Sequence, residues 1–386
     1  FLDPKSVSPG SVMPKFALSE KELSDLASFM ISLRSGVGGR SVGSKVTGVP
    51  PSPTGEAPAP STIPTAAASP EESVRETTPA STVPAISRDP ADLPRTPGSR
   101  PAGHIRVDLE AVEVEGKLAE GASYRYMTFN GRVPGPFIRV RMGDTVELHL
   151  KNNAGSQLAH SIDLHAVTGP GGGSSLTQTS PGQEKVLTFQ ALKPGLFVYH
   201  CATAMVAEHI TSGMYGLILV EPSKGLPAVD HEFYVMQGEI YTRQPFGEYG
   251  LQEFDRRKLL DERPEYLVFN GAVNALTKDH PLHAKVGETA RIFFGVGGPN
   301  RISSFHLIGE HWDRVYDQAS LTSAPLTNVQ TTVVPPGGAT VVEFTLEMPG
   351  RFLLVDHALS RLEHGLLGFL QVEGPANPGI FREGGS

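Results

Sequence analysis

The stretch HCATAMVAEHITSGM, residues 200–214, contains the only cysteine of the 386-residue chain. Within it, Cys201 is followed by His209 and then by Met214. A thiolate, an imidazole and a thioether on one short loop are the ligand types of a blue-copper (type 1) centre. In such a centre two His and one Cys lie roughly in a plane and a weak axial Met completes the site. This loop predicts copper redox chemistry and a second histidine ligand upstream.

The segment HSIDLH, residues 160–165, supplies two candidates for that histidine. Successive side chains of a strand point to opposite faces, so His160 and His165, which are five residues apart, should diverge. His200 and Cys201 are neighbours and should diverge for the same reason. The two sites would then be joined by the peptide bond between Cys201 and His200, a short covalent route for an electron. The simplest assignment is one site of His160, Cys201, His209 and Met214, and a second site of His165 and His200 with Asp163 beside it.

The sequence repeats itself from about residue 104. The offset between matching motifs grows from 140 to about 155 residues, which suits two copies of one domain. We therefore predict an all-β fold of two tandem Greek-key β-sandwiches, over 104–222 and 223–376, followed by a tail over 377–386. The second copy has no Cys, so only the first can carry the thiolate centre. The matching motifs are FNG at 129–131 and 269–271, GDTV at 143–146 and GETA at 287–290, PGLF at 194–197 and PGRF at 349–352, and GMYG at 213–216 and GLLG at 365–368.

The second predicted site still lacks a ligand. A catalytic copper or zinc normally takes three protein ligands and leaves one position for water or substrate. The third ligand should come from another part of the chain or from another chain. His357, in LVDH, lies near the repeat counterpart of His200 and is the most attractive candidate. The histidines that the second sandwich offers are His306, His311, His357 and His364.

Composition agrees with a β-sandwich protein and excludes several classes. The chain has 42 Gly and 33 Pro, and its readable strands are short and rich in Val, Thr, Phe and Tyr, as in sandwiches with many turns. A net charge of −8 argues against a nucleic-acid partner. A single Cys rules out an internal disulfide. The sequence contains no run of about 18 apolar residues, so no membrane-spanning segment is predicted.

Two segments precede the repeat. Residues 1–36 contain the capping box SEKE, residues 19–22, followed by apolar residues at helical spacing, so we expect a short amphipathic helix. Residues 37–103 are rich in Pro, Ser, Thr, Ala and Gly. Such a composition does not form a core, so this part is predicted to be a disordered-type linker.

From about 104 to 376, the chain resembles the copper-containing nitrite reductases, in the branch with the shorter loop at the type 1 site. The resemblance rests on the segments at 160–165 and 200–214 already quoted, on SFHLIGE at 304–310, and on LVDH at 354–357. It implies cupredoxin-like sandwiches and two coppers per monomer, type 1 and type 2. It also implies a homotrimer in which the type 2 copper lies between subunits.

The resemblance also implies a role for each matching residue. The pair that handles protons above the type 2 copper matches Asp163 and His306, and an apolar residue of that pocket matches Ile308. His311 lies five residues past His306, but the FHLIG context places the match on His306, and His311 is taken as structural. The implied type 1 ligands are His160, Cys201, His209 and Met214, and the implied type 2 ligands are His165, His200 and His357, the last from the neighbouring subunit.

The function implied is the reduction of nitrite to nitric oxide and water with one electron and two protons. An electron from a cytochrome c or a cupredoxin would enter at the type 1 copper and pass through Cys201 and His200. Asp163 would donate a proton to the bound oxygen, and His306, through a shared water, would help to supply the second. The resemblance further implies a periplasmic location, although no export signal is present in this sequence.

Residues 1–36 resemble a second family. Asp3-Pro4, then PGSVMP at 9–14 and an amphipathic helix, look like the C-terminal portion of a c-type cytochrome. The chain has no Cys-x-x-Cys-His, so haem c is expected only on a missing N-terminal part of a longer parent chain. A cytochrome domain fused in that parent is one possible electron donor.

Other functions fit the residues less well. A multicopper oxidase would need His-x-His pairs and His-Cys-His, whereas Cys201 is followed by Ala202 and no His-x-His occurs in the chain. A pure electron-transfer cupredoxin would leave the second predicted site and the whole second sandwich without a role. A lone Cys is often only a small buried hydrophobe, and zinc rarely takes a Met ligand. Met205 is the alternative to Met214 but lies close to Cys201 in sequence.

Overall fold

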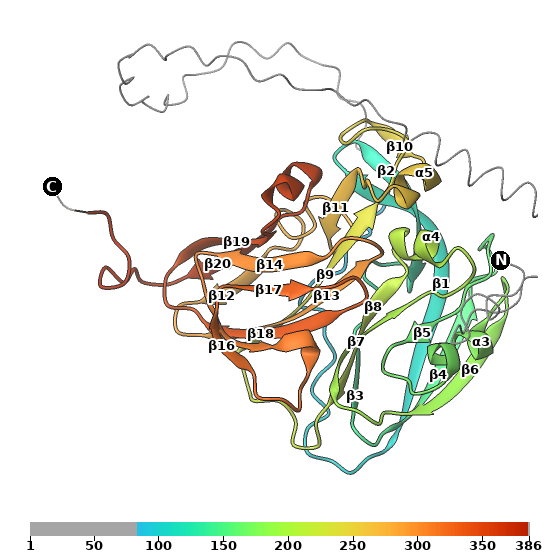
Figure 1. Cartoon of the computed structure of the whole chain (residues 1–386), viewed down its shortest axis with the longest axis horizontal. Helices are drawn as coiled ribbons and strands as arrows, with labels where there is room; N and C mark the ends of the chain where they lie inside the picture. The colour runs from blue at the N-terminus through green and yellow to red at the C-terminus, as the bar shows by residue number, and fades with distance from the viewer. Residues whose placement is uncertain (1–82, 385–386) are drawn as a thin grey trace, which may run out of the picture. The chain divides into compact units, whose positions relative to one another are not determined.

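The computed structural model describes residues 83–384 (Figure 1). These residues fold into two β-sandwiches, built from four sheets in all, as expected from the sequence repeat. The helix expected within 1–36 and most of the expected linker lie outside the described residues, as do the last two residues of the tail. Within the described part, no helix is both long enough and apolar enough to cross a membrane.

The first sandwich packs a five-stranded sheet, in the order β10-β2-β1-β4-β6, with a four-stranded sheet, in the order β3-β8-β7-β5. One strand, β10, comes from the second half of the chain and pairs in parallel with β2. The core between these sheets includes Leu148, Leu164 and Ile218, and Cys201 and Met214 lie in the same cluster. The strands are β1 His104–Ala119, β2 Ala122–Phe129, β3 Ile138–Arg141, β4 Thr145–Asn152, β5 Asp163–Leu164, β6 Glu184–Gln190, β7 Gly195–His200, β8 Tyr215–Glu221 and β10 Gly250–Gln252.

The second sandwich has sheets in the orders β11-β9-β13-β18-β15-β16 and β12-β20-β19-β14-β17. Aromatic rings fill its core: Phe305 stacks on Phe294 at a centroid distance of 3.8 Å and on Trp312 at 5.4 Å. The strands are β9 His231–Ile240, β11 Tyr266–Phe269, β12 Leu282–Lys285, β13 Thr289–Gly298, β14 Ser303–Ile308, β15 Trp312–Tyr316, β16 Leu326–Val329, β17 Thr331–Val334, β18 Ala339–Thr345, β19 Gly350–Asp356 and β20 Gly368–Glu373.

Helices are few and short within the described residues. Most lie in connections between strands, where they close the loops that carry candidate site residues. They are α3 Ser174–Thr177, α4 Val206–Thr211 and α5 Arg256–Leu260, with the 3₁₀ helices η1 Pro170–Gly173, η2 Asp317–Ala319 and η3 Leu359–His364.

Strand alternation explains why β14 presents polar groups on one face. Phe305 and Leu307 are fully buried in the core of the second sandwich. Ser304, His306 and Ile308 alternate with them and point away from that core. A strand of this pattern anchors itself with its apolar residues and leaves a histidine available for chemistry on the other side.

A third hydrophobic cluster joins the two sandwiches. It combines Tyr215 and Leu217 of β8 with Tyr234, Phe293 and Val341 of the second sandwich, all nearly or fully buried. Burial of this much apolar surface between two sheets is what holds a domain core together. The two sandwiches therefore share a core and do not meet only at a surface.

Buried ion pairs cross the same junction. Glu232 accepts hydrogen bonds from Arg139 of the first sandwich at 2.6 Å and from Arg291 of the second at 2.7 Å. The Arg139 side chain also pairs with Glu221 at 2.6 Å, and Arg291 pairs with Glu343. Each arginine is almost fully buried. A buried charge is tolerated only when it is paired. This network therefore determines which side chains of the two sandwiches face one another across the junction.

Residues 83–103 differ from the predicted linker. Ile86 is buried, and its carbonyl accepts a hydrogen bond from the Val133 N–H at 3.0 Å, while the Arg88 N–H donates to the Val133 carbonyl at 2.9 Å. Arg100 forms a bidentate pair with the buried Asp144 at 2.7 and 2.6 Å. The linker prediction is therefore wrong at its C-terminal end. The Pro-rich composition concealed one apolar side chain, Ile86, and one arginine, Arg100, that have partners on the sandwiches.

Candidate metal centres

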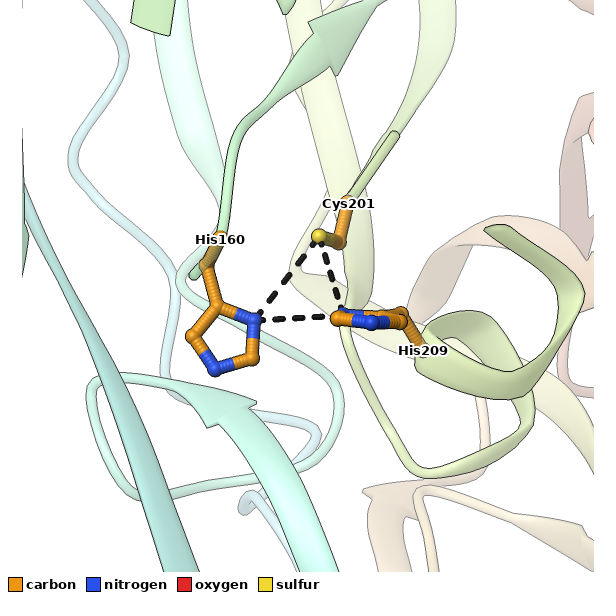
Figure 2. A group of neighbouring side chains, drawn as sticks. All are labelled: His160, Cys201 and His209. Atoms are coloured by element: carbon orange, nitrogen blue, oxygen red, sulfur yellow. Dashed lines mark hydrogen bonds between the residues drawn. The ribbon is translucent and has the colours of Figure 1, made fainter. Parts of the chain in front are cut away.

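Three side chains converge at one end of the first sandwich, and Figure 2 shows them pointing toward one another. The Cys201 Sγ lies 3.3 Å from Nδ1 of His209 and 3.9 Å from Nδ1 of His160, and the two Nδ1 atoms are 3.2 Å apart. All three side chains are buried. We call this group the first cluster. Two imidazole nitrogens and one sulfur at this spacing can coordinate a single ion.

Met214 is held beside the first cluster by its backbone. The Cys201 N–H donates to the Met214 carbonyl at 3.1 Å, and the Met214 N–H donates to the His209 carbonyl at 3.1 Å. The Met214 side chain is fully buried in the same hydrophobic cluster as Cys201. The alternative, Met205, is 48% exposed at the start of α4, so burial favours Met214 as a fourth ligand.

The electrostatics of the first cluster suit a cation. Burial lowers the pKa of His209 to about 4, with a further contribution from His160, and burial also lowers the pKa of His160. Burial raises the pKa of the Cys201 thiol. Without a cation both imidazoles are therefore neutral and the thiol is protonated. Neutral imidazole is the form that binds metals, and an ion would displace the thiol proton. The residues present fit a type 1 copper.

A second group of donor side chains lies on the other face of β7, the strand that ends next to Cys201. His200 pairs with Asp163 across β5 and β7, and the Nε2 atoms of His165 and His200 are 3.1 Å apart. The His200 Nδ1–H donates to the Cys201 carbonyl at 2.9 Å, which leaves Nε2 free for a ligand. We call Asp163, His165 and His200 the second cluster. Its donor atoms lie within 4.8 Å of one another, and it is more exposed than the first.

His306 and His357 lie together on the second sandwich. Their ring centroids are 5.3 Å apart, and both line a depression of about 610 Å³ together with Ser304, Gln330, Thr331 and Ala358. The His306 Nδ1–H donates to the Gln330 carbonyl at 2.6 Å, and the His357 backbone N–H donates to the Ser304 carbonyl at 2.8 Å. Ile308 shares the face of β14 with His306 and is 39% exposed.

One chain does not bring all the expected ligands together. Among the described residues, the second cluster holds Asp163, His165 and His200 and no further His, Cys, Asp or Glu donor. The His306 and His357 depression is a separate site of the same chain. Two imidazoles beside an open face fit a catalytic metal that still needs one protein ligand. His311 is exposed on the turn before β15, where its N–H donates to Glu310.

Sequence reasoning missed several residues that shape these groups. Glu113 accepts a hydrogen bond from His160 at 3.1 Å across 47 residues of sequence, and nothing in the sequence marks it. Asp356, next to His357, is buried and accepts from the N–H groups of Ser304 and Ala358 at 3.1 and 3.0 Å. Gly172 lies against the Asp163 carboxylate, and the run of three glycines at 171–173 was a signal that could have revealed it.

Comparisons with known proteins agree on the chemistry. A family model described as multicopper oxidase matches residues 111–225. A copper-containing nitrite reductase of Neisseria meningitidis serogroup A is 52% identical over 280 residues, covering 72% of this chain and 72% of that protein. One from Pseudomonas chlororaphis is 37% identical over 272 residues, covering 66% of this chain and 74% of that protein. A solved copper nitrite reductase structure from Nitrosomonas europaea has a TM-score of 0.64 at 33% identity, covering 71% of this chain and 96% of that one.

Proposed function

This chain belongs to the family of copper-containing nitrite reductases, and from that premise we propose how its residues divide the reaction. It is a copper-dependent oxidoreductase that reduces nitrite. We propose a type 1 copper held by His160, Cys201, His209 and Met214. We further propose a type 2 copper held by His165, His200 and a His357 from a neighbouring subunit. The observation that carries this assignment is the pair of donor clusters on opposite sides of the Cys201–His200 peptide bond.

The overall reaction takes nitrite, one electron and two protons to nitric oxide and water. When bound, copper would supply the one-electron redox change at the first cluster and a Lewis-acidic position for nitrite at the second. The protein must therefore carry an electron between the clusters and deliver protons to the substrate oxygen.

The electron route is short in this chain. Cys201 and His200 are covalently joined, and the His200 Nδ1–H also donates to the Cys201 carbonyl at 2.9 Å. The hydrogen bond closes a loop beside the peptide bond and fixes the His200 ring. An electron that arrives at the sulfur therefore has both a bonded and a hydrogen-bonded path to the second cluster.

Asp163 and His306 would hold and transfer the protons. Asp163 is a half-buried member of the second cluster, and its carboxyl group would donate to a bound nitrite oxygen there. In His306, Nδ1 donates to Gln330, so Nε2 is the atom left to exchange a proton with water. Ile308, on the same face of β14, would limit the space available to the substrate.

The division of donors between two sites supports a homotrimer. The second cluster lacks one ligand, and His357 and His306 lie in a depression elsewhere on the same chain. A heterologous contact that brings one chain's second cluster to the next chain's depression closes into a ring. The apolar side chains of Ile302, Ile308 and Val333 are between 39% and 55% exposed, and such a contact would cover them.

Location and electron donor follow from the family resemblance. We infer a periplasmic enzyme that receives electrons from a cytochrome c or a cupredoxin. One candidate donor is a cytochrome domain fused to this chain, because residues 1–36 resemble the C-terminal portion of a c-type cytochrome. Those residues lie outside the described part of the structure.

A copper count combined with an activity assay tests the proposal. We expect two coppers per chain, only one of which gives the intense visible absorption of a copper–thiolate bond. We also expect the reduced protein to form nitric oxide when nitrite is added. Four coppers per chain would indicate an oxidase, and a single copper without nitric oxide would indicate an electron carrier.

The Gly172→Ala variant probes the placement of Asp163. Gly172 has φ +54°, and a β-carbon there would overlap Asp163 Oδ1 and contact the Leu164 N–H at 3.0 Å. The carboxyl group must then turn away from the second cluster. We expect nitrite reduction to fall by about 10- to 100-fold, in the range of mispositioned acid–base groups, while the visible absorption of the first cluster is retained.

Gly171→Ala is the matched control for this variant. It has a similar φ of +62°, but its β-carbon would meet only the flexible Ser174 side chain. The conformational strain of placing Ala at this positive φ is therefore comparable to that in Gly172→Ala, and the activity of Gly171→Ala should stay near that of the wild type. Equal losses in the two variants would show that loop strain, and not Asp163, is responsible.

A further inference from the structure

Glu113 contacts the first cluster from the adjacent sheet. It lies on β1, and its Oε1 accepts a hydrogen bond from Nε2 of His160 at 3.1 Å. The opposite ring nitrogen, Nδ1, is the one that faces Cys201 and His209. His160 is fully buried, whereas the Glu113 side chain is 20% exposed. The carboxylate therefore lies at the outer edge of the cluster, with the imidazole between it and the proposed metal position.

The same oxygen also holds the loop that presents His160. Glu113 Oε1 accepts hydrogen bonds from the backbone N–H groups of Gln157 and Leu158 at 3.0 and 2.9 Å. Two backbone N–H groups of this turn and the His160 ring thus donate to a single carboxylate oxygen. Since the turn precedes His160 by only two residues, both the ring and its backbone take their position from Glu113.

A carboxylate in this place has two physical effects on a ligand histidine. It fixes the tautomer with the proton on Nε2, so that Nδ1 presents its lone pair to the metal. It also makes the imidazole a more basic ligand and places a negative charge near the ion. Both effects favour the more positive oxidation state of the bound copper ion. The carbonyl partner of His200 in the second cluster also orients the ring, but it carries no net charge.

We propose that Glu113 is a positioning residue of the type 1 site, which fixes the His160 ring for copper and lowers the reduction potential of the bound ion. This proposal rests on the assignment of the first cluster as the type 1 site. It separates two contributions of one side chain: geometry, which an amide can reproduce, and charge, which it cannot.

Glu113→Gln and Glu113→Ala distinguish the two contributions. In E113Q the amide oxygen can still accept from His160 and the turn, so the visible absorption should persist. The reduction potential should rise by about 59 mV, which corresponds to a tenfold change in the equilibrium of a one-electron couple. In E113A both contributions are lost, and copper at the first cluster should bind about 10- to 100-fold more weakly in competition with a chelator.

Glu115→Gln is the matched control, because Glu115 lies on the same strand and pairs with Ser123, away from the first cluster. Its potential and copper affinity should equal those of the wild type. The proposal is overturned if E113Q and E115Q have the same potential, or if E113A retains copper as tightly as the wild type. The potential is measured without nitrite, so a shift in E113Q supports the role of Glu113 whether or not the protein forms nitric oxide. Failure of the proposed function would show separately, in the nitrite assay of the wild type.

Discussion

Cys201→Ala is expected to lower nitrite-dependent nitric oxide formation by more than about 100-fold, since even the loss of an outer-shell partner of a metal ligand costs up to that factor. The substitution removes the sulfur of the first cluster, and with it the point at which an electron enters. The visible absorption should disappear. His200 keeps its backbone and its hydrogen bond to the carbonyl of residue 201, so copper at the second cluster should remain.

The measurement is nitric oxide formation with a reduced protein donor, together with copper counted per chain. Met205→Ala serves as the control, because Met205 is on the same loop and is 48% exposed. It should keep both coppers and nearly full activity. A C201A protein that reduces nitrite at the wild-type rate with the same donor would contradict the proposed electron route.

The second large effect concerns the division of the type 2 site between chains. His165→Ala and His357→Ala should each be inactive as separate proteins, since each leaves every site one ligand short. When the two variants are assembled together in equal amounts, about a quarter of the interfaces in a closed ring join an intact His165 to an intact His357. Activity should recover to about that fraction of the wild-type value.

His311→Ala is the matched control for these histidine variants. It lies on the second sandwich and is exposed, but it does not line the depression of His306 and His357. It should keep full activity alone and in mixtures. An active H357A protein, or mixed assemblies with no recovery, would count against a site shared between subunits.

All three residues of the first cluster were named from the sequence, because strand parity and loop spacing are local properties. His200 and Cys201 belong to one strand end, and their divergence to opposite sides follows from the pleat alone. The repeat likewise predicted two sandwiches, and the four sheets confirm that architecture. The loop from Cys201 to Met214 is closed by its own backbone hydrogen bonds, so its ligands needed no distant partner to be recognised.

Other parts of the structure depend on contacts between residues far apart in the sequence, which the alternation of side chains along a strand does not predict. Glu113, on β1, reaches His160, which lies 47 residues further along the chain, and the sequence does not state which segments are neighbours in space. Residues 83–103 were predicted as linker because composition averages over a segment, whereas one buried Ile86 and the Arg100–Asp144 pair decide its path. Whether His357 acts within its own chain or on a neighbour is a question of assembly, which no single-chain pattern answers.

The shared core and the Arg139–Glu232–Arg291 bridge make the angle between the sandwiches a property of the isolated subunit. In the proposed ring, each subunit then arrives with its donor and acceptor surfaces already set at the orientation that closure requires. This constrains how the assembly can evolve. A substitution at the junction between the two sandwiches would misalign all three inter-chain sites of the proposed trimer, although no residue of any site had changed.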